Sequence, residues 1–139
     1  MNKTVCLCAS FRFFKELTKV SRVLTKKGVI CLTPKPFKFR DQEHPAYFCN
    51  MWDDLSHSDK LKVSQEAELD YLEKVDKADI LYVINPSGYV GKSVLFEVGY
   101  AFAKGKVIFF QEPVQDFAIM GLVQRIATTE DVVKFIEAE

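Results

Sequence analysis

The sequence has few of the features that mark membrane-bound, secreted or nucleic-acid-binding proteins. No apolar run approaches the roughly 20 residues that a membrane-spanning helix needs, and residues 1–8 hold too short an apolar stretch for a signal peptide. Basic and acidic side chains number 19 each, so the formal net charge is zero and no general basic field attracts nucleic acid. We therefore expect a cytoplasmic protein that binds neither a membrane nor a nucleic acid polymer.

Cysteine and histidine are too few and too scattered to suggest a metal centre. The four cysteines are Cys6, Cys8, Cys31 and Cys49, and only two histidines are present. No Cys-x-x-Cys pair or nearby histidine completes a zinc site. We expect reduced and mostly buried thiols, with Cys6 and Cys8 on one face of a strand, and neither a metal nor a cofactor.

The sequence does contain a regular alternation of strand and helix patterns within 139 residues, which is enough for one domain spanning residues 1–139. Short apolar runs predict strands at residues 4–8, 29–32, 80–84 and 107–110, with residues 122–126 as a fifth candidate. Apolar residues at helical spacing predict helices over residues 13–24, 61–75, 93–104 and 129–137. This order predicts an α/β fold, a Rossmann-like or flavodoxin-like three-layer sandwich with a mainly parallel sheet of about five strands.

The segment 33–60 interrupts the alternation of strands and helices. Loops of this length in a compact domain are usually functional, and this one follows the second predicted strand on the side where ligands bind. We interpret it as a lid or a base-stacking wall, with a dimer contact or a locally packed Ω-loop as alternatives. The segment is rich in proline, histidine and aromatic residues: Pro34, Pro36, Pro45, His44, His57, Trp52, Phe37, Phe39, Tyr47 and Phe48.

A glycine-rich loop between the third predicted strand and the next helix is the sharpest functional signal. Ligands bind beyond the carboxyl ends of parallel strands, and the backbone N–H groups at a helix start favour an anion. Gly88 and Gly91 would allow a ligand to approach the backbone, and Ser87 and Ser93 can donate hydrogen bonds. Gly91-Lys92-Ser93 resembles part of a P-loop, but that pattern requires glycine at position 86, where the chain has proline.

Three further residues could carry chemistry at this edge of the sheet. Glu97 stands among apolar neighbours in the first turns of the helix after the glycine-rich loop, as either a paired structural carboxylate or a tuned catalytic one. Ser10 and Arg12 follow the first strand at the start of a helix. Arg12 offers a forked donor suited to phosphate, although Ser10 could be only an N-cap and Arg12 only an exposed side chain.

Together these residues resemble the nucleoside 2-deoxyribosyltransferase superfamily and, within it, the 2'-deoxynucleoside 5'-phosphate N-hydrolases. The resemblance runs from the first strand to Phe110. It rests on these stretches: Cys8-Ala9-Ser10-Phe11-Arg12, Ala78-Asp79-Ile80, Pro86-Ser87-Gly88, Glu97-Val98-Gly99-Tyr100-Ala101 and Gly105-Lys106.

The resemblance implies a nucleoside or nucleotide substrate and an N-glycosidic bond as the point of attack. Glu97 would be the nucleophile at C1' of a deoxyribosyl group, and Ser10, Arg12 and Ser87 would hold a 5'-phosphate. Such cleavage passes through an oxocarbenium-like state that a carboxylate stabilises or traps. The resemblance also implies a homodimer, for which residues 111–121, with Phe117, Ile119 and Met120, are a candidate contact; an ordinary core-packing turn is the alternative.

The chain departs from this family at the second catalytic carboxylate. The loop between Gly88 and Glu97 is longer than in those hydrolases, and Tyr71 occupies the position at which the family has an aspartate. Asp70 is the neighbouring carboxylate, so we predict Asp70 as the partner of Glu97 and Tyr71 as a substrate-binding residue. Three hypotheses follow: an N-glycosidase or deoxyribosyltransferase, a nucleotide-binding protein of the same fold with altered chemistry, and a P-loop-like or other enzyme.

Overall fold

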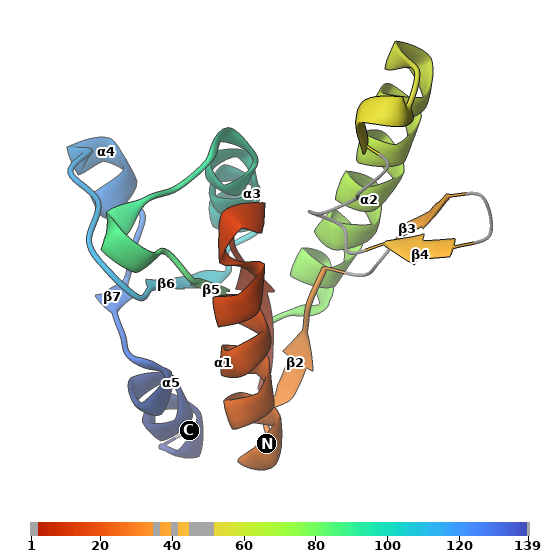
Figure 1. Ribbon diagram of the computed structural model, residues 1–139. Helices are drawn as coiled ribbons and strands as arrows, with labels where there is room; N and C mark the ends of the chain where they lie inside the picture. Colours follow the sequence, from red (N-terminus) through yellow and green to blue (C-terminus); the bar gives the residue numbers. More distant parts are fainter. Residues whose placement is uncertain (1–2, 35–36, 40–41, 45–51, 139) are drawn as a thin grey trace.

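The computed structural model describes residues 3–34, 37–39, 42–44 and 52–138, and within them a five-stranded parallel sheet (Figure 1). The strand order is β2-β1-β5-β6-β7, and every neighbouring pair is parallel. The predicted α/β fold with a parallel sheet is therefore confirmed. The strands are β1 (Thr4–Cys8), β2 (Ile30–Leu32), β5 (Ile80–Val83), β6 (Val107–Phe110) and β7 (Arg125–Ile126).

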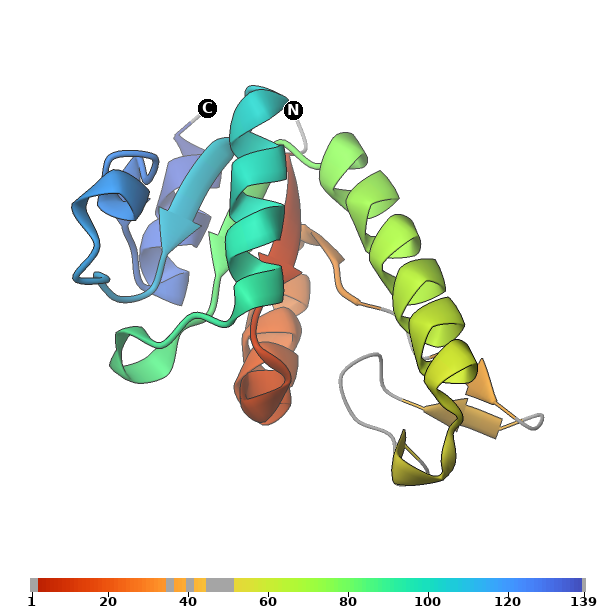
Figure 2. The ribbon, with the colours of Figure 1, turned by 90° about the horizontal axis from the view of Figure 1, so that it is seen from above.

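Helices cover both faces of this sheet and make the three layers (Figures 1 and 2). One core packs the sheet against α1 and α5, and a second core packs it against α2 and α3. None of the helices in the described ranges is long and apolar enough to cross a bilayer. The helices are α1 (Phe14–Lys26), α2 (His57–Lys77), α3 (Lys92–Ala103), α4 (Phe117–Met120) and α5 (Thr129–Glu137).

Strand β1 contributes side chains to both cores because its residues alternate between the two faces of the sheet. Successive side chains of a strand point to opposite faces, so Val5 and Leu7 join the core under α1 and α5. Cys6 and Cys8 join the core under α2 and α3, and both are fully buried free thiols. The predicted placement of the two cysteines on one face is confirmed, whereas Cys49 lies outside the described residues.

The structure differs from the sequence prediction mainly in the irregular segments. The fifth strand is only Arg125–Ile126, because Leu122 and Val123 instead continue the turn of α4 and pack against the second core. Helix α2 begins at His57, earlier than predicted, because the Ser56 hydroxyl caps it by accepting a hydrogen bond from the Asp59 N–H at 3.0 Å. Helix α4 was not predicted.

The predicted loop over residues 33–60 contains an antiparallel hairpin of β3 (Phe37–Phe39) and β4 (Gln42–His44). Both ribbon views place this hairpin beside the first half of α2 and away from the main sheet (Figures 1 and 2). The lid function of this segment stays a prediction, and residues 45–51 within it lie outside the described ranges.

The predicted dimer contact also stays a prediction. Its three apolar residues differ in exposure: the Phe117 side chain is 91% exposed, whereas Ile119 packs against the second core.

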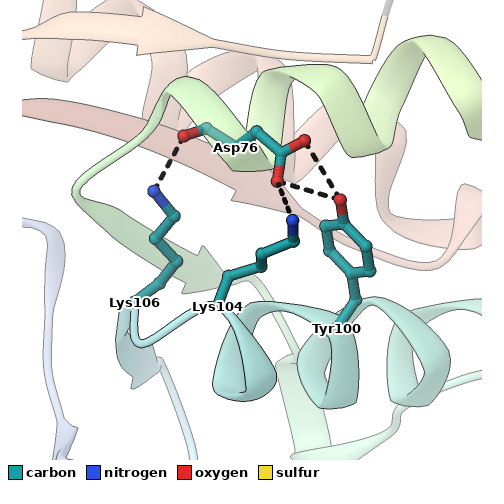
Figure 3. A network of polar contacts seen from close by, with 4 residues as sticks. All are labelled: Asp76, Tyr100, Lys104 and Lys106. Atoms are coloured by element: carbon teal, nitrogen blue, oxygen red, sulfur yellow. Dashed lines mark hydrogen bonds and ion pairs between the residues drawn. The ribbon is translucent and has the colours of Figure 1, made fainter.

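A polar network joins the carboxyl-terminal ends of α2 and α3 (Figure 3). The Tyr100 hydroxyl donates to the two carboxylate oxygens of Asp76 at 2.9 and 3.0 Å, and Lys104 Nζ lies 3.7 Å from the same carboxylate. Lys106 Nζ donates to the Asp76 carbonyl at 2.8 Å. The network fixes the two helices to each other at the end of the sheet opposite to the loops described next.

Candidate active site

The loops that follow β1 and β5 enclose a cleft of about 570 Å³ at the carboxyl edge of the sheet. Pockets of roughly 300–1,000 Å³ accommodate small organic ligands. The structure thus brings together four of the predicted site residues, Ser10, Arg12, Gly91 and Ser93. The complete lining is Ala9, Ser10, Phe11, Arg12, Tyr89, Gly91, Lys92, Ser93 and Val94.

Ser10 and Gly91 join the two loops. The Ser10 Oγ accepts a hydrogen bond from the Gly91 N–H at 3.0 Å. A Cβ added at Gly91 would lie 2.7 Å from that oxygen, so glycine is required for this close approach.

Two helical segments begin at this cleft without a side-chain cap. The Ser10 side chain bonds to Gly91 and caps nothing in the 3-10 turn Phe11–Phe13 that leads into α1. Gly91, the N-cap of α3, has no side chain to offer. N–H groups at the start of a helix need an acceptor and favour a negative charge. The cleft therefore provides donors for an anionic ligand.

Basic side chains accompany these donors. The guanidinium of Arg12 stacks over the ring of Tyr89, with 3.7 Å between Cζ and the ring centroid. Phe13 packs edge-on against the same ring at 6.0 Å between centroids, which holds Tyr89 in place. Lys92 lines the cleft from the first turn of α3. An aromatic wall and two cations thus share one cleft, an arrangement suited to a phosphorylated ligand.

Three consecutive backbone N–H groups of the glycine-rich loop are bonded within the protein. Its N–H groups already have acceptors within the protein: Ser87 donates to Glu112 Oε2 at 2.8 Å, Gly88 to the Asn85 carbonyl at 2.8 Å and Tyr89 to the Pro86 carbonyl at 3.3 Å. Ser87 is exposed and, like Gly88, is absent from the cleft lining. These bonds count against the P-loop hypothesis and leave the predicted role of Ser87 and Gly88 in ligand binding without a contact that supports it.

Gly88 has a structural role that a substitution can test. Its φ is +77°, and an added Cβ would lie 2.7 Å from the Pro113 carbonyl oxygen. We expect Gly88→Ala to lower the free energy of unfolding by about 1–3 kcal/mol, because both strain and a backbone contact oppose the methyl group. Gly99→Ala is the matched control: Gly99 lies on exposed α3 surface with nothing within 4 Å, so this change should stabilise the helix by about 0.5–1 kcal/mol. Urea unfolding of both variants measures the difference, and equal effects would contradict the role of Gly88.

Glu97 is a buried carboxyl beside the end of β1. Its side chain is 1% exposed, and its Oε1 accepts a hydrogen bond from the Cys8 thiol at 3.2 Å. Its Oε2 is buried and receives no hydrogen bond from a donor in the described part of the chain. Val94, three residues earlier on α3, lines the cleft. Residues three apart share a helix face, so Glu97 lies one turn beyond the cleft lining on the same face of α3.

Burial is the main cause of an unusual protonation state at Glu97. It raises the pKa of this carboxyl from 4.5 to about 9, and hydrogen bonding to Glu68 and the charge of Glu68 act in the same direction. The Cys8 thiol opposes the shift. Glu97 is therefore protonated in the free protein at neutral pH.

Besides burial, the group that raises the pKa of Glu97 is Glu68, a residue that the sequence analysis did not single out. Asp70, the predicted partner, instead forms an ion pair with Lys74 at 3.3 Å. Tyr71 is buried, and its hydroxyl donates to the Leu7 carbonyl at 2.6 Å. Glu68 precedes Tyr71 by three residues, and residues three apart share a helix face. That spacing was the available signal: the helix face that carries Tyr71 also carries a carboxylate one turn earlier.

Comparisons with known proteins agree with this architecture. No protein-family model and no curated protein matches the chain, but solved structures do. The fold is that of a 2-deoxyribosyltransferase. The deoxyribosyltransferase of Bacillus psychrosaccharolyticus superposes with a TM-score of 0.61 at 17% identity, covering 94% of this chain and 90% of its own. The expected resemblance to the nucleoside 2-deoxyribosyltransferase superfamily is thereby confirmed at the level of the fold.

Two other solved structures have the same fold. A conserved protein of Enterococcus faecalis V583 superposes with a TM-score of 0.63 at 11% identity, with 99% of each chain covered. A CMP N-glycosidase of Clostridium botulinum superposes with a TM-score of 0.54 at 17% identity, with 98% of each chain covered. The likeness spans nearly the whole of each chain, so it includes the segments that carry the cleft and Glu97.

Proposed function

We propose that this protein cleaves the N-glycosidic bond of a deoxynucleoside or its 5'-monophosphate, with Glu97 as the nucleophile that bonds to C1'. The observation that carries the proposal is the buried Glu97 carboxyl. Its Oε2 has no donor in the described residues, and Glu97 lies one turn from Val94, which lines a cleft of ligand size. A carboxyl held there at the cost of desolvation is typical of a reactive site. The fold it shares with a deoxyribosyltransferase and a CMP N-glycosidase supports the same chemistry.

The cleft favours a 5'-phosphate on the substrate. Ser10, Arg12, Lys92 and Ser93 and two uncapped helix starts converge on it, whereas a neutral nucleoside would need none of these charges. Tyr89 and Phe11 are partly exposed aromatic walls of the same cleft, and aromatic rings are suited to stack on a sugar or base. Ser87, which the sequence analysis also assigned to the phosphate, is absent from the lining of this cleft.

Arg12→Ala tests the phosphate site. We expect the affinity for a deoxynucleoside 5'-monophosphate to fall by about 10–100-fold, because a charge-assisted hydrogen bond contributes about 1.5–3 kcal/mol. The affinity for the unphosphorylated nucleoside should change little. Arg22→Ala, which removes an exposed arginine from α1, is the control and should bind like the wild type. Calorimetric titration of the three proteins with both ligands measures these affinities, and equal affinity of Arg12→Ala and wild type for the monophosphate would remove Arg12 from the site.

A panel of deoxynucleosides and their 5'-monophosphates, with free base measured by chromatography, tests the proposed activity. Base release in water alone indicates hydrolysis, and release only with a second base present indicates transfer, since the two reactions differ in what accepts the sugar. Tight binding without base release would instead support the alternative of a nucleotide-binding protein with altered chemistry. The observation that favours this alternative is at Tyr71, which stands where the family has its second catalytic aspartate and whose hydroxyl donates to the Leu7 carbonyl.

A further inference from the structure

Arg12 lies in the cleft with only the flat face of its guanidinium engaged. Its Cζ lies 3.7 Å from the centroid of the Tyr89 ring. In the part of the chain that the structure describes, no carboxylate pairs with this guanidinium and no acceptor receives a hydrogen bond from it. A guanidinium carries its five N–H donors along its edges and stacks through its face. The stack on Tyr89 therefore leaves those donors available to a ligand in the cleft that Arg12 lines.

Contacts other than the stack fix the position of Tyr89. The Tyr89 N–H donates to the Pro86 carbonyl at 3.3 Å. Two residues later, the Gly91 N–H donates to Ser10 Oγ at 3.0 Å. The Tyr89 ring packs edge-on against Phe13, with 6.0 Å between the ring centroids and an angle of 73° between the ring planes. The backbone on both sides of Tyr89 and one neighbour of its ring thus hold it without help from the arginine.

The 3-10 turn Phe11–Phe13 meets the Tyr89 ring through two adjacent side chains, Arg12 and Phe13. The Phe13 N–H donates to the Ser10 carbonyl at 2.9 Å, which fixes this turn at the end of β1. Because both partners of the stack belong to fixed segments of backbone, the guanidinium is held in one place. An arginine without such a support would sample many rotamers, and a ligand would have to select one of them.

This support affects the free energy of binding. Ordering a long side chain at the moment of binding costs free energy, and a side chain that is already held avoids that cost. A carboxylate could also hold an arginine, but it would occupy the N–H donors and offset part of the positive charge. An aromatic face attracts the cation without accepting hydrogen bonds from the edges of the guanidinium. The Tyr89 ring therefore holds Arg12 and leaves its charge and its donors to the ligand.

We propose that Tyr89 is the positioning residue of Arg12: its ring holds the guanidinium so that the edge donors meet the 5'-phosphate of the substrate. This role rests on the proposed function, specifically on its phosphate site. The oxygens of a phosphate match the forked edge of a guanidinium, and Lys92 lines the same cleft as a second cation. Of the two aromatic walls, Phe11, which is 63% exposed, is then the ring left for a base or a sugar.

The first test measures the stack without any ligand, by NMR of the Arg12 side chain. Protons that lie over an aromatic ring resonate upfield of their usual positions, and the Arg12 signals are assigned by their loss in Arg12→Ala. We expect these signals to move to the positions of an exposed arginine in Tyr89→Leu and to stay upfield in Tyr89→Phe, which keeps the ring. Phe102→Leu removes an exposed ring from α3 and is the control that should leave them unchanged. Unchanged Arg12 signals in Tyr89→Leu would overturn the proposal.

The second test measures affinity by calorimetry for a deoxynucleoside and its 5'-monophosphate. Tyr89→Leu should weaken binding of the monophosphate by about 3–10-fold, the cost of ordering one long side chain, and should leave binding of the nucleoside unchanged. Tyr89→Phe should retain the wild-type affinity. When Arg12→Ala is already present, Tyr89→Leu should cause no further loss, because a residue that acts only through Arg12 has nothing left to position.

Three results would overturn the role of Tyr89. An equal loss for nucleoside and monophosphate would mean that the ring contacts the base or the sugar. A loss in Tyr89→Phe as large as in Tyr89→Leu would mean that the hydroxyl binds the phosphate directly. If the wild type binds the monophosphate no more tightly than the nucleoside, the phosphate site and the role of Tyr89 fail together. The base-release panel decides separately whether the proposed cleavage stands, since these affinities are measured without turnover.

Discussion

Glu97→Gln is expected to abolish the release of free base, with a loss of at least about 10³-fold in kcat, because an amide cannot replace a carboxylate as the nucleophile at C1'. Glutamine keeps the size of the side chain and its ability to accept the Cys8 thiol hydrogen at Oε1. The loss should be equal for ordinary bases and for a nitrophenolate leaving group. This equality is expected of the group that bonds to C1', whereas loss of a proton donor would spare a leaving group that departs as a stable anion.

The same variant should fold as well as the wild type. A buried carboxyl with an oxygen that no described donor satisfies destabilises the native state, so a neutral amide is expected to leave the melting temperature unchanged or to raise it. Circular dichroism melts check this point. Full base release by a folded Glu97→Gln protein would contradict the nucleophile assignment, and an unfolded variant would contradict the view that this carboxyl serves chemistry at the expense of stability.

The stability of the wild-type protein is expected to fall as the pH rises from about 5 to about 9. In the unfolded chain Glu97 titrates near 4.5, whereas burial raises the pKa of the folded-state carboxyl to about 9. Between these values the native state binds a proton that the unfolded state does not. Stability from this group is therefore complete below the unfolded pKa and is lost as the pH approaches the folded one, by up to about 1.4 kcal/mol per pH unit.

Urea unfolding at about pH 6 and about pH 8 measures this slope, and comparison with Glu97→Gln isolates it. Over two pH units the wild type should lose on the order of 2 kcal/mol more than the variant. The buried thiols contribute in the same direction, but only near and above their unfolded value of 9.0, so both proteins share their effect. Parallel pH profiles for the two proteins would show that Glu97 is ionised in the native state.

The local alternation of the sequence was enough to predict the α/β fold and, to within a residue at each end, the first four strands of the sheet. The strand over residues 4–8 places Cys6 and Cys8 on one face because a strand repeats every two residues. Helix α5 has the predicted bounds because Thr128 and Asp131 form a reciprocal cap within four residues of sequence. The same local signals also pointed to Ser10, Arg12, Gly91 and Ser93, since all four lie near the carboxyl ends of predicted parallel strands.

Contacts between residues far apart in the sequence determined the details that the local pattern did not predict. The Ser87 N–H donates to Glu112, which comes from the loop after β6, so this donor is already used within the protein. Hairpin β3–β4 was missed because it pairs within a segment whose prolines predicted a loop. Asp70, the predicted partner of Glu97, lies 3.3 Å from Lys74, while the Tyr71 hydroxyl holds α2 to β1 through the Leu7 carbonyl.

The sequence by itself determined the fold and the edge of the sheet that carries the cleft, and it singled out Glu97, which lies one turn beyond the cleft-lining Val94 on α3. These follow from residue periodicity and from the rule that parallel strands gather their carboxyl ends at one edge. Only the tertiary structure decided which side chains surround Glu97 and which face the cleft. On a helix one residue corresponds to a rotation of about 100°, so these contacts depend on how each helix is seated against the sheet.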